Sequence, residues 1–299
     1  MIRKRYNKAF QAVSAILLLA AVLLCMGGCT QTVPKVPEPP KPMPTHSVPL
    51  FETDELDAQI ERDAFYRGAA YYIDAYRERY DAYRDLHPDL AAEAVIRAVN
   101  AETDRPFYTE TTHADLSYGY LALVNKYHYV GDEDAPELVP LGDYGVDYLE
   151  KTAAEWFRKM VDAAKEDGIS LRAVSPYRTY WLQNLYYTGY VERSGVEAAD
   201  RYSARPGYSE HQLGFAVDIN TASFSSHFET KPEYAWLIEH CADYGYILRY
   251  LPDSEDITGY RYEPWHYRYV GVEHAKRITD LGITFEEYYA YFVANPDRP

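Results

Sequence analysis

A chain of 299 residues can hold one large domain or two modest ones, and its 47% apolar composition is enough for a hydrophobic core. The formal net charge of -16 at pH 7 argues against a nucleic-acid-binding protein. It argues equally against attachment to an anionic membrane through general electrostatics.

The amino terminus has the pattern of an export signal. Basic residues precede an apolar run over residues 12–26, which is too short and wrongly flanked for an ordinary spanning helix. Small residues then lead to Cys29, an arrangement that resembles a bacterial lipoprotein signal, in which this cysteine is acylated. We predict a lipoprotein-type signal peptide over residues 1–28 and lipidation at Cys29. A simple signal peptide or an uncleaved anchor is the alternative.

A proline-rich segment over residues 29–50 follows the signal. Such a composition favours extended polyproline geometry, so we predict a tether that holds the rest of the chain away from the membrane. Beyond residue 29 the only cysteine is Cys241, so no disulfide is expected and its side chain is predicted to be buried.

Residues 51–112 are predicted to form a small helical region. The segment 53–55 has the polar and acidic residues of a helix start, and Pro88 suits the first turn of a further helix. Tyrosines recur at helical spacing, at Tyr72, Tyr76, Tyr80 and Tyr83. Packing support for the main domain is the simpler interpretation of this region, and a binding module is the alternative.

Residues 113–299 mix predicted strands and helices. Strands are expected over 121–125, 171–174, 215–219 and 246–250, with an extended segment over 261–270. Helices are expected over 147–166, 179–190 and 232–244, then from Val272 and after a capping box at Thr284. Several strands follow one another without a helix between them, so we predict an α+β domain with an antiparallel sheet.

Two stretches of this domain carry candidate chemistry. His211 and Asp218 are seven residues apart and cannot share one straight strand face, so a bend at Gly214 is expected. Glu263 and His266 flank Pro264 and Trp265, and the proline excludes helical geometry for Glu263. Two imidazoles and a carboxylate would form a three-ligand zinc set with a spare carboxylate beside it. From the residues alone, separate structural roles for each histidine are an equal alternative.

The combined motifs resemble the VanY-type D-alanyl-D-alanine carboxypeptidases, zinc peptidases of bacterial wall metabolism. They are Ser209-x-His211-x-x-Gly214-x-Ala216-x-Asp218, then Glu263-Pro264-Trp265-His266, and upstream Ser175-Pro176-Tyr177-Arg178-Thr179 with Gln183. The likeness covers roughly residues 117–293. It implies a hedgehog/D,D-peptidase-like fold, an antiparallel sheet flanked by helices, in a zinc domain over residues 113–299 that follows the helical region.

The resemblance also implies roles for single residues. His211, Asp218 and His266 would hold one Zn²⁺ per chain, and Glu263 would be the general base. Arg178 would grip the terminal carboxylate of the substrate, with Ser209, Tyr177 and Gln183 as further substrate contacts.

The sequence therefore predicts a zinc metallocarboxypeptidase that removes terminal D-alanine from peptidoglycan stem peptides. The reaction is that of serine-type D-Ala-D-Ala carboxypeptidases, but the mechanism would be metal-dependent. Expected partners are these peptides, with no nucleic acid, and membrane contact only through the anchor of an extracytoplasmic lipoprotein. A D,D-dipeptidase, an L,D-carboxypeptidase or a wall endopeptidase of the same fold is the nearest alternative. A non-catalytic wall-binding lipoprotein is the alternative of a different class.

Overall fold

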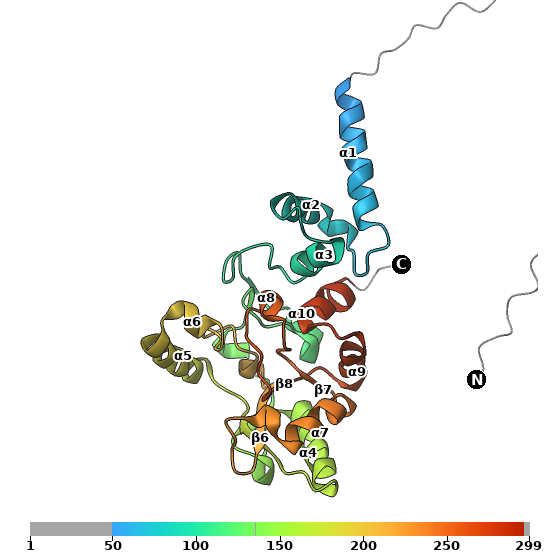
Figure 1. Cartoon of the computed structure of the whole chain (residues 1–299). Helices are drawn as coiled ribbons and strands as arrows, with labels where there is room; N and C mark the ends of the chain where they lie inside the picture. The colour runs from blue at the N-terminus through green and yellow to red at the C-terminus, as the bar shows by residue number, and fades with distance from the viewer. Residues whose placement is uncertain (1–49, 135, 296–299) are drawn as a thin grey trace, which may run out of the picture. The chain divides into compact units, whose positions relative to one another are not determined.

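The computed structural model describes residues 50–134 and 136–295 (Figure 1). The predicted signal peptide, Cys29 and all of the predicted tether except Leu50 lie outside this range. Among the described residues, no helix combines the length and the apolarity that crossing a bilayer requires.

The first described segment is helical, as predicted, but its helices begin elsewhere. It contains α1 (Leu50–Tyr66), α2 (Arg77–Leu86), α3 (Ala92–Asn100) and a 3-10 turn, η1 (Asp74–Tyr76). Thr53 therefore lies inside α1, Tyr72 precedes the second helix, and Pro88 lies in a turn before α3. The buried side chains of this segment form a cluster of their own: Tyr66, Ile73, Tyr80, Ala92, Val95, Ile96, Val99 and, from the far end of the chain, Ala290.

A four-stranded antiparallel sheet forms the centre of the following domain. Its strands are β5 (Leu171–Ser175), β6 (Ala216–Thr221), β8 (His266–Tyr269) and β7 (Tyr246–Leu248), in that spatial order. The predicted α+β class with an antiparallel sheet is confirmed. Two short pairs lie outside the sheet: β1 (Thr112–His113) with β2 (His128–Tyr129) in parallel, and β3 (Leu138–Pro140) with β4 (Tyr148–Glu150) in antiparallel orientation.

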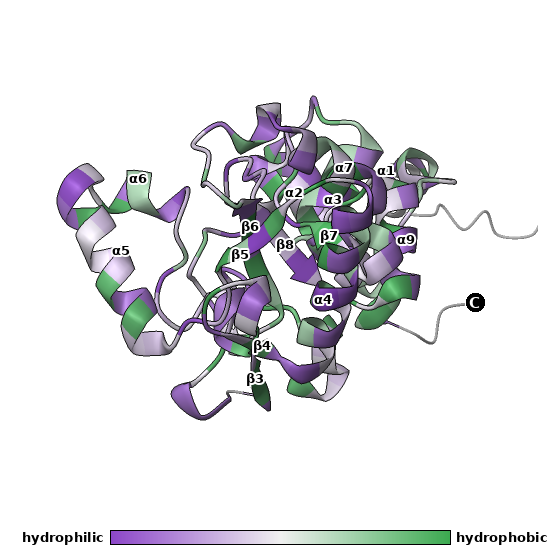
Figure 2. Cartoon of the chain, turned by 90° about the horizontal axis from the view of Figure 1, so that it is seen from below, coloured by the Kyte–Doolittle hydropathy of each residue, from purple (hydrophilic) through white to green (hydrophobic). Residues whose placement is uncertain are grey.

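The remaining helices include two that pack against the sheet, α4 (Lys151–Glu166) and α7 (Pro232–His240). The others are α5 (Tyr180–Ser194), α6 (Val196–Asp200), α8 (Glu255–Thr258), α9 (Val272–Leu281) and α10 (Phe285–Tyr288). In Figures 1 and 2, α5 and α6 lie to one side of the sheet. Figure 2 shows that α5 carries both polar and apolar residues. The predicted capping box is present at the start of α10.

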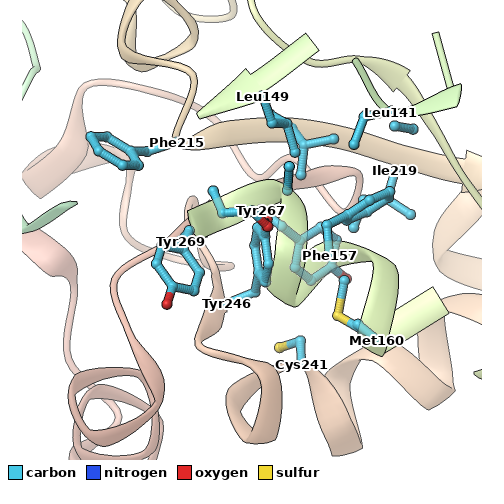
Figure 3. Close-up of a cluster of buried hydrophobic side chains, with 14 of the residues drawn as sticks. Leu141, Leu149, Phe157, Met160, Phe215, Ile219, Cys241, Tyr246, Tyr267 and Tyr269 are labelled. Carbon is cyan, nitrogen blue, oxygen red and sulfur yellow. The ribbon is translucent and has the colours of Figure 1, made fainter. Parts of the chain in front are cut away.

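Alternation along the strands gives the sheet two chemically different faces. Val217 and Tyr267 are cross-strand partners on one face, where they join the apolar core with residues of α4 and α7. Figure 3 shows Phe157 and Met160 of α4 beside sheet tyrosines in this core. The opposite face carries the cross-strand pairs Ala216–Arg268 and Asp218–His266. One face of the sheet therefore packs against the apolar core, and the other face carries buried polar side chains.

Candidate metal centre and active site

A left-handed turn at Gly214 brings His211 back towards Asp218. His211 lies in a 3-10 turn, η5 (Glu210–Leu213), which Gly214 ends with a φ of 65°. A Cβ at this position would lie 2.8 Å from the backbone nitrogen of Glu150, so glycine is needed both for the conformation and for the space. The predicted bend at Gly214 is confirmed.

The sheet brings the second histidine to the same place. Asp218 of β6 and His266 of β8 are direct partners in the antiparallel ladder, so their side chains lie on the same face. Together with His211 they offer three ligand atoms that all lie within 4.8 Å of one another. Segments far apart in the chain thus meet at one point.

Two of the distances between these atoms match the ligand spacing of a tetrahedral zinc site. Asp218 Oδ1 lies 3.6 Å from His211 Nε2 and 3.4 Å from His266 Nδ1. Ligands at zinc–nitrogen and zinc–oxygen distances of about 2.0–2.1 Å in tetrahedral geometry are about 3.4 Å apart. His211 Nε2 and Asp218 Oδ1 are buried without a hydrogen-bond partner among the described residues. The three residues therefore fit a metal ion that would satisfy these atoms.

Hydrogen bonding prepares His211 as a ligand. Its Nδ1 lies 2.7 Å from the carbonyl oxygen of Pro176, which can only accept, so Nδ1 carries the proton and Nε2 presents its lone pair. Burial lowers the pKa of His211 well below its usual value, and the charge of Arg178 adds to this effect. His211 is therefore a neutral imidazole, the form that binds metals.

The electrostatic surroundings act in opposite directions on the pKa values of Asp218 and His266, the other two residues of the cluster. Burial alone would raise the pKa of Asp218, but His266 and Arg178 outweigh it and keep the group a carboxylate. Burial would lower the pKa of His266, yet Asp218 and Glu210 raise it to about 9. A metal bound at this site would compete with the proton on His266.

Glu263 lies beside His211, Asp218 and His266 without belonging to the cluster. It stands in the turn before β8, where its carbonyl oxygen accepts from the backbone nitrogen of His266. Its Oε2 lies 3.6 Å from His266 Nδ1. Burial raises the pKa of Glu263 to about 7, and the negative charge of Asp218 acts in the same direction. A buried carboxylate of this kind is suited to take up and release a proton near neutral pH.

Arg178 lies on the other side of Asp218. Its Nη2 is 3.2 Å from Asp218 Oδ2, its Nη1 donates to Gln183 Oε1 at 2.7 Å, and its Nε is buried without a partner among the described residues. Gln183 is fully buried and donates to the carbonyl oxygen of Ala204, so it supports the guanidinium from behind. Tyr177 is partly buried, which raises its pKa, and Ser209 is buried at the start of η5.

A buried ion network that the sequence motifs did not predict lies next to His266. Glu210 Oε1 accepts from Arg249 Nε at 2.8 Å and lies 3.3 Å from Arg268 Nη1. The two Nη atoms of Arg249 donate to Glu286 of α10 at 2.8 and 2.6 Å. All four side chains are buried. The signal in the sequence was the arginine within each of two otherwise uncharged strand segments, 246–250 and 266–270.

Comparisons with known proteins identify the relatives of this chain. Residues 146–272 match the family model for VanY, D-alanyl-D-alanine carboxypeptidase. The chain is 34% identical over 180 residues to VanXYC of Enterococcus gallinarum, a bifunctional D-Ala-D-Ala dipeptidase and carboxypeptidase, and the match covers 57% of this chain and 94% of that protein. A Bacillus subtilis (strain 168) protein named as a carboxypeptidase, YodJ, is 40% identical over 181 residues, which are 56% of this chain and 66% of that protein.

Solved structures share the fold. The L,D-carboxypeptidase LdcB is 37% identical with a TM-score of 0.57, over 61% of this chain and 91% of that one. A VanY variant in complex with Zn(II) is 36% identical with a TM-score of 0.52, over 56% of this chain and 98% of that one. From the site geometry and these matches, the chain belongs to the VanY family of D-alanyl-D-alanine carboxypeptidases.

Proposed function

We propose that this protein is a zinc-dependent D-alanyl-D-alanine carboxypeptidase that removes the terminal D-alanine from peptidoglycan stem peptides ending in D-Ala-D-Ala. The observation that carries the proposal is the cluster of His211, Asp218 and His266 with Glu263 beside it. The family relationship supports it, since VanY has been solved with Zn(II) and VanYB with D-alanine-D-alanine.

The positions of the residues support the following proposed roles. A zinc ion at the cluster would lower the pKa of a water molecule and polarise the scissile carbonyl. Glu263 would accept the proton of the attacking water at Oε2 and deliver it to the amine that leaves. Its burial favours the exchange, because a raised pKa makes the carboxylate a stronger base near neutral pH.

Among the described residues near the cluster, Arg178 is the best suited to bind the terminal carboxylate of the substrate. Its unpartnered Nε–H and the second hydrogen on Nη2 form a fork that matches two carboxylate oxygens. Gln183 fixes the orientation of this fork through Nη1. In this assignment Gln183 acts on the substrate through Arg178, because its own side chain is fully buried.

Metal content and product release test the proposal together. Purified protein should contain one zinc per chain and release D-alanine from a pentapeptide stem, a chelator should stop the release, and added zinc should restore it. Release that continues unchanged in chelator contradicts the metal mechanism. If zinc-loaded protein releases no D-alanine, the proposed substrate is wrong.

An L,D-carboxypeptidase is the second candidate, favoured by the structural match to LdcB. The two activities differ in the residue before the terminal D-alanine, which is a D-centre in one case and an L-centre in the other. Parallel assays on a pentapeptide stem and on a tetrapeptide stem with an L-residue at that position decide between them. Cleavage of the tetrapeptide alone would replace the D,D assignment.

We also propose that the mature enzyme is an extracytoplasmic lipoprotein acylated at Cys29, with residues 29–50 as its tether and the helical region 51–112 and zinc domain 113–299 beyond. The pattern of residues 1–29 supports this location. Metabolic labelling with a fatty acid tests it, with Cys29→Ser as the comparison. The wild type should carry the label and the variant should not, and equal labelling of the two contradicts acylation at this residue.

A further inference from the structure

Glu210 and His266 present two buried, unsatisfied atoms to each other. His266 Nε2 lies 3.5 Å from Glu210 Oε2, and neither atom has a hydrogen-bond partner among the described residues. Both side chains are buried. A slight tilt of the imidazole ring would shorten this distance to that of a hydrogen bond. The bond is favoured because a buried polar atom without a partner costs free energy.

The chemistry of the pair decides which histidine nitrogen carries the proton. A carboxylate can only accept, so Glu210 favours the proton on Nε2 and leaves the lone pair on Nδ1, the atom that faces Asp218. We infer that Glu210 is a positioning residue that fixes the tautomer and ring orientation of His266 for zinc. Carboxylate partners of this kind strengthen metal ligation by histidine. The inference rests on the zinc site of the proposed function.

The ion network holds Glu210 in one orientation. Its Oε1 is engaged by Arg249 Nε at 2.8 Å and faces Arg268 Nη1 at 3.3 Å, so only Oε2 is left for His266. Both guanidinium groups face Oε1 with N–H donors, so this side of residue 210 can hold only an acceptor. A glutamine at this position would therefore have to place its oxygen there and its NH₂ group towards His266.

In Glu210→Gln the two arginines would keep the amide oxygen on their side and turn the amide NH₂ towards His266. Nε2 of His266 would then have to accept, which moves the proton to Nδ1, the atom that should bind zinc. We expect the zinc affinity to fall about 10–100-fold. The affinity is measured without substrate, by competition with a chromophoric chelator at a fixed pH.

Glu286→Gln is the matched control. It removes one negative charge from the same network and keeps its shape, but Glu286 contacts Arg249 and not His266. Its zinc affinity should stay within a few-fold of the wild type. Equal affinities in all three proteins, or equal losses in both variants, would overturn the inference.

A second measurement does not depend on the variants folding. In the zinc-loaded wild type, nitrogen-detected NMR of labelled histidines should show His266 ligated through Nδ1 and protonated at Nε2. Ligation through Nε2 would overturn the role of Glu210. A wild type that binds no zinc would instead contradict the proposed function, so the two failures are distinguishable.

Discussion

Glu263 is buried beside the ligand cluster but outside it, so its chemical role and its structural role can be separated. Glu263→Gln keeps the shape of the side chain and removes the base. Turnover should fall by about 10²–10⁴-fold, the usual contribution of a positioned general base. Zinc content, measured by elemental analysis, should match the wild type. Loss of the metal in this variant would make Glu263 a ligand instead of a base.

Arg178 contacts Asp218, a predicted metal ligand, and is proposed to bind the terminal carboxylate of the substrate. A single substitution separates these two roles. Arg178→Lys keeps the charge near Asp218 but removes the fork. Hydrogen bonds to charged groups contribute about 1.5–3 kcal/mol each, so KM should rise about 10–100-fold with zinc affinity unchanged. An unchanged KM with weaker zinc binding would assign Arg178 to Asp218 alone.

The candidate residues could be chosen from the sequence itself, but only the family resemblance implied that they meet. Asp218 stands out as a carboxylate in an apolar strand, and such a group requires a partner. Nothing local says that its partner is His266, because that contact depends on strand pairing between distant segments. Glu210 escaped notice because it stands on a short turn, where a charged residue is ordinary.

At the scale of elements, the turn at Gly214 predicts how much stability is lost when this glycine is replaced. Gly168, beyond α4, has a similar backbone conformation, with φ of 78°, but open space around it. Gly168→Ala should therefore lower the free energy of unfolding only by the strain of the left-handed conformation, about 1–2 kcal/mol. Gly214→Ala should lose more, because the new methyl group would also meet Glu150 and Leu138 Cδ2, at 2.8 and 2.9 Å. Urea unfolding of the metal-free proteins measures both, and equal losses would contradict the steric argument.

Most elements of the zinc domain follow from periodicity, and the exceptions have physical causes. The strand predicted over 121–125 is wrong: a 3-10 segment, η2 (Leu116–Leu121), leads into a loop, and the carbonyl oxygens of Tyr120 and Ala122 accept from the buried guanidinium of Arg268. The helix predicted from residue 147 begins at Lys151, because residues 148–150 pair with β3. In both cases a tertiary partner overrides the local pattern.

At the scale of the whole molecule, the helical region and the end of the chain share one core. Ala290 is buried in the cluster formed by α1–α3, Tyr71 packs against Tyr291 at 4.8 Å between ring centroids, and Arg97 pairs with Glu287 at 2.9 Å. These contacts join the first described helices to the segment that carries Glu286. We therefore expect residues 50–295 to unfold together, although the domain boundary at 112/113 stays a prediction.

Val95→Ala tests this cooperativity. Val95 is fully buried in the shared cluster, so the loss should be about 2 kcal/mol, or roughly 4–8 °C in a single Tm. Val196→Ala makes the same change at an exposed position of α6 and should leave Tm almost unchanged. Calorimetry should show one transition in each protein. A separate early transition in Val95→Ala would mean that the helical region melts independently.

The direct pairing of Asp218 with His266 across β6 and β8 also bears on how this chain could change in evolution. Inserting or deleting one residue within either strand would turn its side chains to the opposite face and separate the two groups. The connection between the strands, residues 222–265, carries no such constraint on its length where it runs as loop. Length variation among relatives should therefore gather in the loops of that connection and spare β6, β8 and β7, which pairs with β8.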